Sequence, residues 1–106
     1  MIISKHTFKR TDTSLPWSNL FDNLSETFKN QLTEFKEYRD LHAVNFGEKP
    51  DDYTFVSITI WEETEFNNFL EWVNTRVNYE EWLSELKVAE AAQGFEFTRT
   101  LENVST

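Results

Sequence analysis

The stretch that decides the fold is YTFVSITIWEETEFNNFLEW, residues 53–72. Most of residues 53–61 are β-branched or aromatic, which predicts a strand. Both alternating faces of this strand carry apolar side chains, as is typical of a strand covered on two sides. After Trp61 the apolar spacing changes to three and four, in a short stripe of Phe66, Phe69, Leu70 and Val73. The stretch therefore predicts a central strand that leads into an amphipathic helix.

The chain before this stretch predicts a strand, a long helix and a second strand. Residues 2–10 alternate, which places Ile2, Ser4, His6, Phe8 and Arg10 on one face of a strand. An apolar stripe at helical spacing then runs without interruption over residues 17–35. Residues 38–46 alternate again, and GEKPDD at residues 47–52 is a turn signal. We expect residues 38–61 to form a β-hairpin.

The chain after this stretch predicts a second helix and a last strand. Asn78 and Glu81 have the spacing of a capping box, so we expect a bend near residues 76–78 and a new helix behind it. Gly94 is a natural C-terminal cap for that helix. Residues 95–104 alternate as a final strand. The resulting order, β-α-β-β-α-α-β, is an α+β ferredoxin-like arrangement, βαββαβ with a split second helical region.

The aromatic residues of this sheet lead to a prediction about assembly. If both helical regions cover one face, we expect the other face to carry aromatic and small polar residues. A sheet face with that much apolar surface needs a second cover, and another copy of the chain is the simplest one. We therefore predict a homodimer. The residues assigned to this uncovered face are Tyr53, Phe55, Trp61, His6, Phe8 and Phe97.

The composition excludes several classes of function. The 106 residues contain no cysteine, two glycines and a formal charge of −9, and no linker divides residues 1–106, which we interpret as one domain. Without cysteine there is no disulfide scaffold, thiolate metal site or thiol nucleophile. Two glycines are too few for a nucleotide-binding loop. The negative charge disfavours nucleic acid as a partner. The chain has no apolar run long enough for a membrane, and residues 1–10 lack a secretory signal pattern, so we expect a cytoplasmic protein.

The strand, its terminal Trp61 and the helix with Phe66 and Trp72 resemble a segment of the dimeric α+β barrel proteins. In particular, the stretch is similar to the antibiotic-biosynthesis-monooxygenase (ABM) superfamily. This resemblance implies two ferredoxin-like subunits packed sheet to sheet, each with a cavity between its sheet and its helices. It also implies chemistry of the family's kind, which includes cofactor-free oxygenation of aromatic polyketides and haem degradation. The haem-degrading pattern requires a histidine in the second helical region, and this chain has none after His42.

Three residues are candidates for catalysis. His6 and His42 are the only imidazoles, and either side chain can act as a general base near neutral pH. The alternative for each is an ordinary structural histidine. Arg99 shares a predicted face with aromatic residues, where it needs a carboxylate, a ligand anion or a dimer partner. No metal-binding spacing of histidine and carboxylate occurs, so we predict neither a metal nor a cofactor.

Five further residues are candidates for ligand binding: Asn45, Tyr53, Ser57, Trp61 and Trp72. In the scheme that the resemblance favours, an imidazole assists deprotonation of a phenolic substrate. Trp61 and Tyr53 hold its ring, and Arg99 or Asn45 stabilises the developing oxyanion. The structural alternative for Trp61 and Trp72 is core packing.

Two functions of different classes follow from the sequence. The first is a homodimeric α+β barrel that binds a small apolar or aromatic molecule, with cofactor-free monooxygenation as the reaction class. The alternative is a non-catalytic acidic interaction module, viral or accessory, that acts through its negative charge. A third hypothesis is a dimerisation module whose pocket is filled by its own aromatic side chains. An open cavity with a histidine or arginine in its wall would favour the first.

Overall fold

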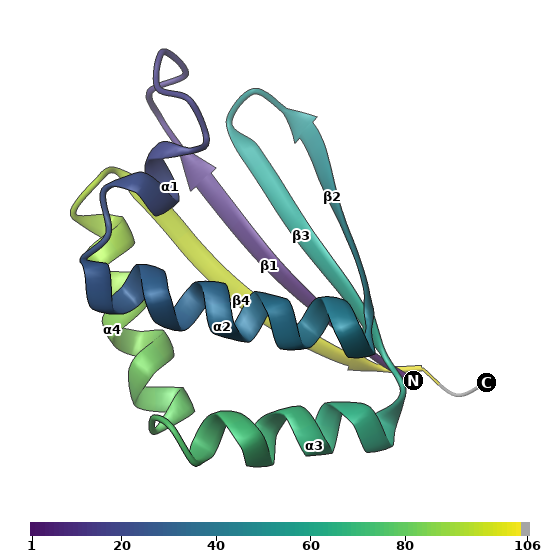
Figure 1. Cartoon of the computed structure of the whole chain (residues 1–106). Coiled ribbons are helices and arrows are strands. Elements are labelled where there is room, and N and C mark those ends of the chain that lie inside the picture. The colour runs from purple at the N-terminus through teal and green to yellow at the C-terminus, as the bar shows by residue number, and fades with distance from the viewer. Residues whose placement is uncertain (105–106) are drawn as a thin grey trace.

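A computed structural model describes residues 1–104 of the chain. It contains one four-stranded antiparallel sheet with helices packed against it (Figure 1). The elements in chain order are β1 (Ile2–Arg10), α1 (Asn19–Asp22), α2 (Glu26–His42), β2 (Val44–Asp51), β3 (Thr54–Trp61), α3 (Glu63–Asn74), α4 (Tyr79–Ala91) and β4 (Phe95–Asn103).

The strand order β2-β3-β1-β4 confirms the ferredoxin-like prediction. All three strand pairs are antiparallel, and β1 lies at the centre between β3 and β4. The register places His6 opposite Ser57 on one side and opposite Arg99 on the other. Residues that pair in this way point to the same face of the sheet, so these three side chains share one face.

The first helical region differs from the prediction of one continuous helix over residues 17–35. A short helix, α1, ends at Asp22, and α2 begins at Glu26 after Ser25, whose hydroxyl accepts a hydrogen bond of 3.3 Å from the backbone N–H of Phe28. This N-cap satisfies one of the free N–H groups of the new helix. The apolar stripe hides the break because residues on both sides of Ser25 face the core.

The predicted strand over residues 38–46 is wrong in its first half. Residues 38–42 continue α2, because Tyr38 adds one more turn to the apolar face and stacks on Trp72 of α3 with ring centroids 4.4 Å apart. Strand β2 begins only at Val44 and continues through most of the predicted turn to Asp51. The tertiary contact therefore decides between helix and strand where alternation alone favoured a strand.

Gly47 lies where an aromatic ring approaches the backbone closely, and it is not part of a turn. It lies within β2 opposite Ser57, and a Cβ added to it would lie 2.9 Å from Cζ of Phe55. The ring of Phe55 thus occupies the space above Gly47. The chain reverses later, at residues 52–53.

The second helical region matches the prediction closely. Helix α3 ends at Asn74, and α4 begins behind Asn78, whose side chain accepts a hydrogen bond of 3.2 Å from the N–H of Glu81. Gly94 follows α4 with a φ of 85°, which is the left-handed conformation that favours glycine in this position.

Of the six residues assigned to the uncovered face, all but Tyr53 lie on the face that the helices cover, which reverses our assignment. Trp61 and Phe97 are buried in the core with Phe66 and Trp82, and Phe55 packs on Trp17 at 5.8 Å between ring centroids. The helix-covered face of β1 is the one that carries His6 and Phe8. The prediction was reversed because both faces of β3 are apolar, so alternation alone did not reveal which one the helices cover.

The outer face of the sheet carries an apolar surface of its own. It carries Val44 and Phe46, which are exposed, next to Ile58 and Ile60 in the register. Lys5 lies opposite Ile58 on the neighbouring strand. In Figure 1 this face has no helix against it.

Candidate functional site

A cavity of about 460 Å³ lies between the sheet and the helices, lined by β1–β4 as well as α2, α3 and α4. Most of its wall is aromatic or aliphatic, and its size falls in the range of small-molecule pockets. The apolar side chains that surround it include Phe8, Trp17, Phe55, Trp82, Leu86 and Phe97.

Three of the predicted site residues lie together in the wall that the sheet contributes: His6, Asn45 and Ser57. The amide nitrogen Nδ2 of Asn45 donates to Oγ of Ser57 at 3.1 Å and to Oγ1 of Thr59 at 2.9 Å. These bonds run from β2 to β3 and fix the Asn45 side chain. The sheet thus presents ordered polar groups to an otherwise apolar space.

The imidazole of His6 is neutral at pH 7. Burial, together with the positive charges of Arg99 and Arg39, lowers the pKa of His6 to about 4. Its ring meets Phe97 edge to face at 5.3 Å between centroids. A neutral imidazole in this position is a hydrogen-bonding group and a weak base.

The helices contribute charged groups to the same cavity. Lys36 and Arg39 come from α2, and Glu90 comes from α4. Burial raises the pKa of Glu90 to about 7, and the charge of Lys36 opposes this shift. Burial lowers the pKa of Lys36 from its ordinary value, and Arg39 adds to the effect. Oε2 of Glu90 has no hydrogen-bond partner among residues 1–104.

His42 and Tyr53 lie away from this cavity. His42 ends α2, where its Nδ1 is 3.1 Å from Oε2 of Glu65 and its ring packs on Tyr38 at 4.4 Å between centroids. Tyr53 is exposed at the β2–β3 turn and contributes to a different surface pocket with Lys9. The prediction that these two side chains share a site with His6 is therefore wrong. It assumed that both belong to strands, whereas His42 ends a helix and Tyr53 lies in a turn.

Arg99 shares the covered face of the sheet with His6 but does not line the cavity. Its Nη1 lies 3.7 Å from Oε1 of Glu80, and its guanidinium lies 5.3 Å from the ring centre of Tyr79. Its Nε is buried and has no hydrogen-bond partner within residues 1–104. The expected carboxylate partner of Arg99 is thus Glu80, at the start of α4.

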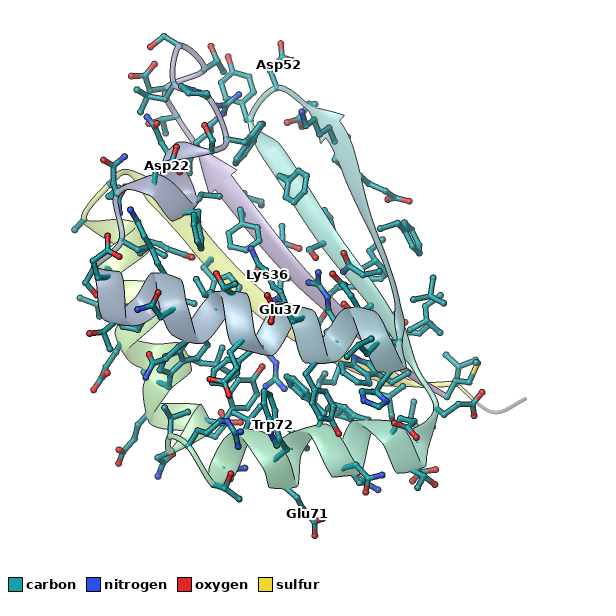
Figure 2. The ribbon with its side chains drawn as sticks, in the orientation of Figure 1. Asp22, Lys36, Glu37, Asp52, Glu71 and Trp72 are labelled. Atoms are coloured by element: carbon teal, nitrogen blue, oxygen red, sulfur yellow. The ribbon has the colours of Figure 1, made fainter. Side chains whose placement is uncertain are left out.

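The two tryptophans among the candidates are packing residues. Trp61 is buried against Phe66 and Phe69. Trp72 stacks on Tyr38, and the guanidinium of Arg76 lies 4.2 Å from its ring centre. Figure 2 shows Trp72 pointing from α3 toward α2, whereas the neighbouring Glu71 points away. Neither tryptophan lines the cavity.

Sequence reasoning missed three cavity residues, Lys36, Arg39 and Glu90. Glu90 had a readable signal, since it follows Trp82 and Leu86 at successive intervals of four and so lies on the apolar face of its helix. Lys36 and Arg39 had no such signal, because the predicted helical stripe ended at residue 35 and both residues follow it.

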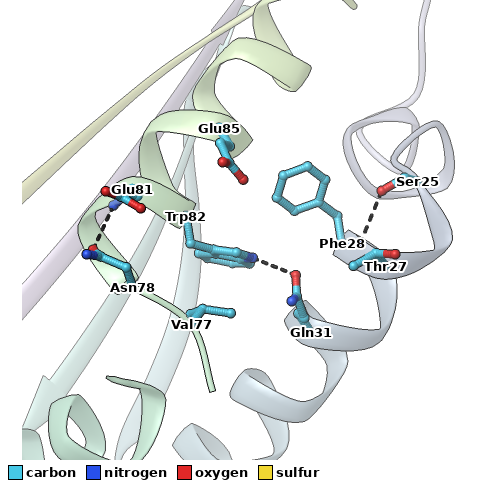
Figure 3. Close-up of a pocket in the computed structure, with 9 residues that line it drawn as sticks. All are labelled: Ser25, Thr27, Phe28, Gln31, Val77, Asn78, Glu81, Trp82 and Glu85. Carbon is cyan, nitrogen blue, oxygen red and sulfur yellow. Dashed lines mark hydrogen bonds between the residues drawn. The ribbon is translucent and has the colours of Figure 1, made fainter. Parts of the chain in front are cut away.

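A second, smaller pocket of about 230 Å³ lies between α2 and α4 (Figure 3). The N-caps Ser25 and Asn78 and the acidic residues Glu81 and Glu85 line it. The ring of Trp82 forms part of its wall. Ser25 and Asn78 each accept a hydrogen bond from a backbone N–H of their own helix. These side-chain oxygens already have partners within the chain.

Two features are absent from the described part of the chain. Residues 1–104 contain no group of three or more His, Asp or Glu side chains arranged to hold a metal ion. None of the helices within these residues has the length and apolarity to cross a membrane.

Comparison with known proteins found a similar solved structure. No family model matches the chain, and no curated protein matches it. The similar structure is a mutant of SnoaB, a cofactor-independent oxygenase from Streptomyces nogalater. The superposition covers 99% of this chain and 93% of that chain, at 9% sequence identity and a TM-score of 0.44.

Proposed function

We propose that this chain binds a small, largely apolar organic molecule in the cavity between the sheet and the helices. The observation that carries the proposal is the cavity itself: about 460 Å³, aromatic in most of its wall, with a few polar groups converging on it. Such a combination is the usual form of a small-molecule site, since the apolar wall supplies affinity and the polar groups set orientation.

The alternative functions have less support. An acidic interaction module requires no internal cavity, and the dimerisation module required a pocket closed by its own aromatic rings. His6 and Arg39 line the cavity wall, which is the feature that we expected of a ligand site. The negative charge of the chain accordingly serves solubility in this proposal.

A matched pair of variants on β3 tests the binding site. The probe is methylnaphthalene, followed by its own fluorescence. Ser57→Leu places a larger side chain in the cavity, and Thr54→Leu places the same side chain on the outer face of the same strand. We expect at least a tenfold loss of affinity for Ser57→Leu and no change for Thr54→Leu. No binding by the unmodified chain, or equal binding by both variants, would contradict the proposal.

We further propose that two copies pack through the outer faces of their sheets. The apolar surface of Val44, Phe46 and Ile60 supports this arrangement, because a stable dimer buries an apolar centre. The same face carries Lys5 and Glu48, and a two-fold axis can bring opposite charges together at the rim. This replaces the interface of our sequence interpretation, which used residues that face the helices, with one formed by Val44, Phe46 and Ile60.

Cofactor-free oxygenation is the reaction class that we propose to test in this cavity. A balanced test reaction converts one α-naphthol and one O₂ into one naphthoquinone and one water. The neutral imidazole of His6 and the carboxyl group of Glu90 are the groups that can take the hydroxyl proton. Oxygen uptake in the presence of a metal chelator, with quinone formed in equal amount, is the expected result. Binding of naphthol without oxygen uptake would contradict an oxygenase function and leave ligand binding in place.

A further inference from the structure

Glu90 is a buried carboxyl group whose Oε2 is an unused acceptor in the cavity wall. The residue is 4% exposed, and its Oε2 has no hydrogen-bond partner among residues 1–104. Its spacing of four from Leu86 directs its side chain to the inward face of α4. A carboxylate removed from water is unfavourable unless another group hydrogen-bonds to it. The cavity therefore presents an acceptor that the described residues leave unused.

The other charged groups around the cavity restrict what can approach this acceptor. Lys36 and Arg39 line the same space from α2, while His6 from β1 is neutral at pH 7. A cationic ligand would place a third positive charge beside those two side chains, and a carboxylate ligand would compete with Glu90 for them and carries no donor for Oε2. The fifth titratable group in the wall, Tyr79, is uncharged at this pH.

We propose that Glu90 selects ligands that carry an uncharged hydrogen-bond donor, a hydroxyl or an amide N–H, on an apolar body. The donor points at Oε2 of Glu90, and the body packs against neighbouring rings such as Trp82 and Phe97. This inference rests on the proposed function, because it names the ligand class of the same cavity. Glu90 acts here as a specificity residue, since a site with a buried acceptor rejects an analogue that lacks the donor.

The experiment compares four naphthalene derivatives substituted at the same ring position. Naphthalenemethanol carries the uncharged donor, methylnaphthalene lacks it, naphthylmethylamine carries a cation at pH 7, and naphthoic acid carries an anion. Calorimetric titration of the unmodified chain should give the tightest binding for the alcohol, about tenfold tighter than for the hydrocarbon. Tighter binding of the amine or the acid would overturn the ligand class.

The variants assign the preference to Glu90. In Glu90→Met we expect the alcohol to bind no better than methylnaphthalene, while the affinity for methylnaphthalene stays within about twofold of the parent value. Glu85→Met, on the same helix and outside the cavity wall, should keep the full preference. An alcohol preference that survives in Glu90→Met would overturn the inference.

A second measurement uses the unmodified chain, so it does not require any variant to fold. With the glutamate side chains labelled at the carboxyl carbon, the Glu90 NMR signal of the unmodified chain should shift with the alcohol and not with methylnaphthalene. Equal binding of both compounds without that shift would overturn the role of Glu90 but leave the ligand site intact. Failure of all four compounds to bind would instead contradict the proposed function.

Discussion

The indole nitrogen of Trp82 on α4 donates a hydrogen bond of 2.7 Å to Oε1 of Gln31 on α2 (Figure 3). Trp82 is buried, and its ring stacks on Tyr79 at 6.0 Å between ring centroids. The bond thus ties together the two helices that enclose one end of the cavity. An indole N–H is a donor only, so it depends on this single acceptor among the described residues.

Removing that acceptor should destabilise the fold. Gln31→Met leaves the buried indole N–H of Trp82 without a partner, which costs about 1–3 kcal/mol of the free energy of unfolding. Urea denaturation measures the change. Asn30→Met, at an exposed position of the same helix, should change stability by less than about 0.5 kcal/mol. Equal effects of the two variants would show that the hydrogen bond contributes nothing.

The two glycines should respond differently to alanine. In Gly47→Ala the new Cβ meets the ring of Phe55, which must move toward the cavity that it lines, so we expect weaker probe binding as well as lower stability. In Gly94→Ala the Cβ meets nothing within 4 Å, and the cost of about 1 kcal/mol comes from the positive φ alone. Probe titration and urea denaturation of both variants check this. Unchanged binding in Gly47→Ala would contradict the role of Phe55.

Glu90 should make the folded state less stable as the pH rises. Its pKa is about 7 in the fold against 4.5 for an ordinary glutamate, so folding takes up a proton between these values. The free energy of unfolding then falls as the pH rises from 4.5 to 7, by at most about 3 kcal/mol. Glu90→Gln removes this loss, so its stability relative to the parent should increase over that window. The variant Gln93→Met, which removes no titratable group, should give an offset independent of pH.

His6 should have the opposite effect. Its pKa is about 4 in the fold against 6.5 for an ordinary histidine, so the unfolded chain binds the proton first when the pH falls. Stability from this group is present above pH 6.5 and is lost toward pH 4, by at most about 3 kcal/mol. His6→Gln should lose this dependence, and NMR titration of the parent should place the midpoint near pH 4. A midpoint near 6.5 would contradict the buried, neutral imidazole.

These two titrations overlap between pH 4.5 and 6.5 and partly cancel there. The parent chain should therefore show a nearly flat stability profile in that range, although each single variant shows a slope. Only the pair of variants separates the two contributions, because they have opposite signs.

The outer face of the sheet gives the test of the dimer. Phe46→Asp places a charge at the centre of the proposed interface, and the variant should sediment as a monomer where the parent sediments as a dimer. Phe46 is 42% exposed within one chain, so the substitution should leave the fold intact. The matched control is Leu41→Asp, at a residue that is 80% exposed on α2. A monomeric parent chain at micromolar concentration would contradict the proposal.

Alternation, helical spacing and capping residues were sufficient to predict the order of the elements. The bounds of β1 and the bend before Asn78 follow from local chemistry, since the side-chain period and the cap act within a few residues. Residues 38–42 show where local chemistry is not enough. Their alternation fits a strand, yet the packing of Tyr38 on Trp72 makes them helical.

The faces of the sheet and the composition of the cavity depend on contacts between segments distant in the chain. Both faces of β3 are apolar, so only the contacts of Trp61 with α3 and of Phe55 with Trp17 show that these two side chains point inward. His6, Lys36 and Glu90 are far apart in the sequence and meet only because the helices fold back over the sheet. A local pattern fixes the direction of a side chain relative to its own element, but the packing of the elements determines what that side chain faces.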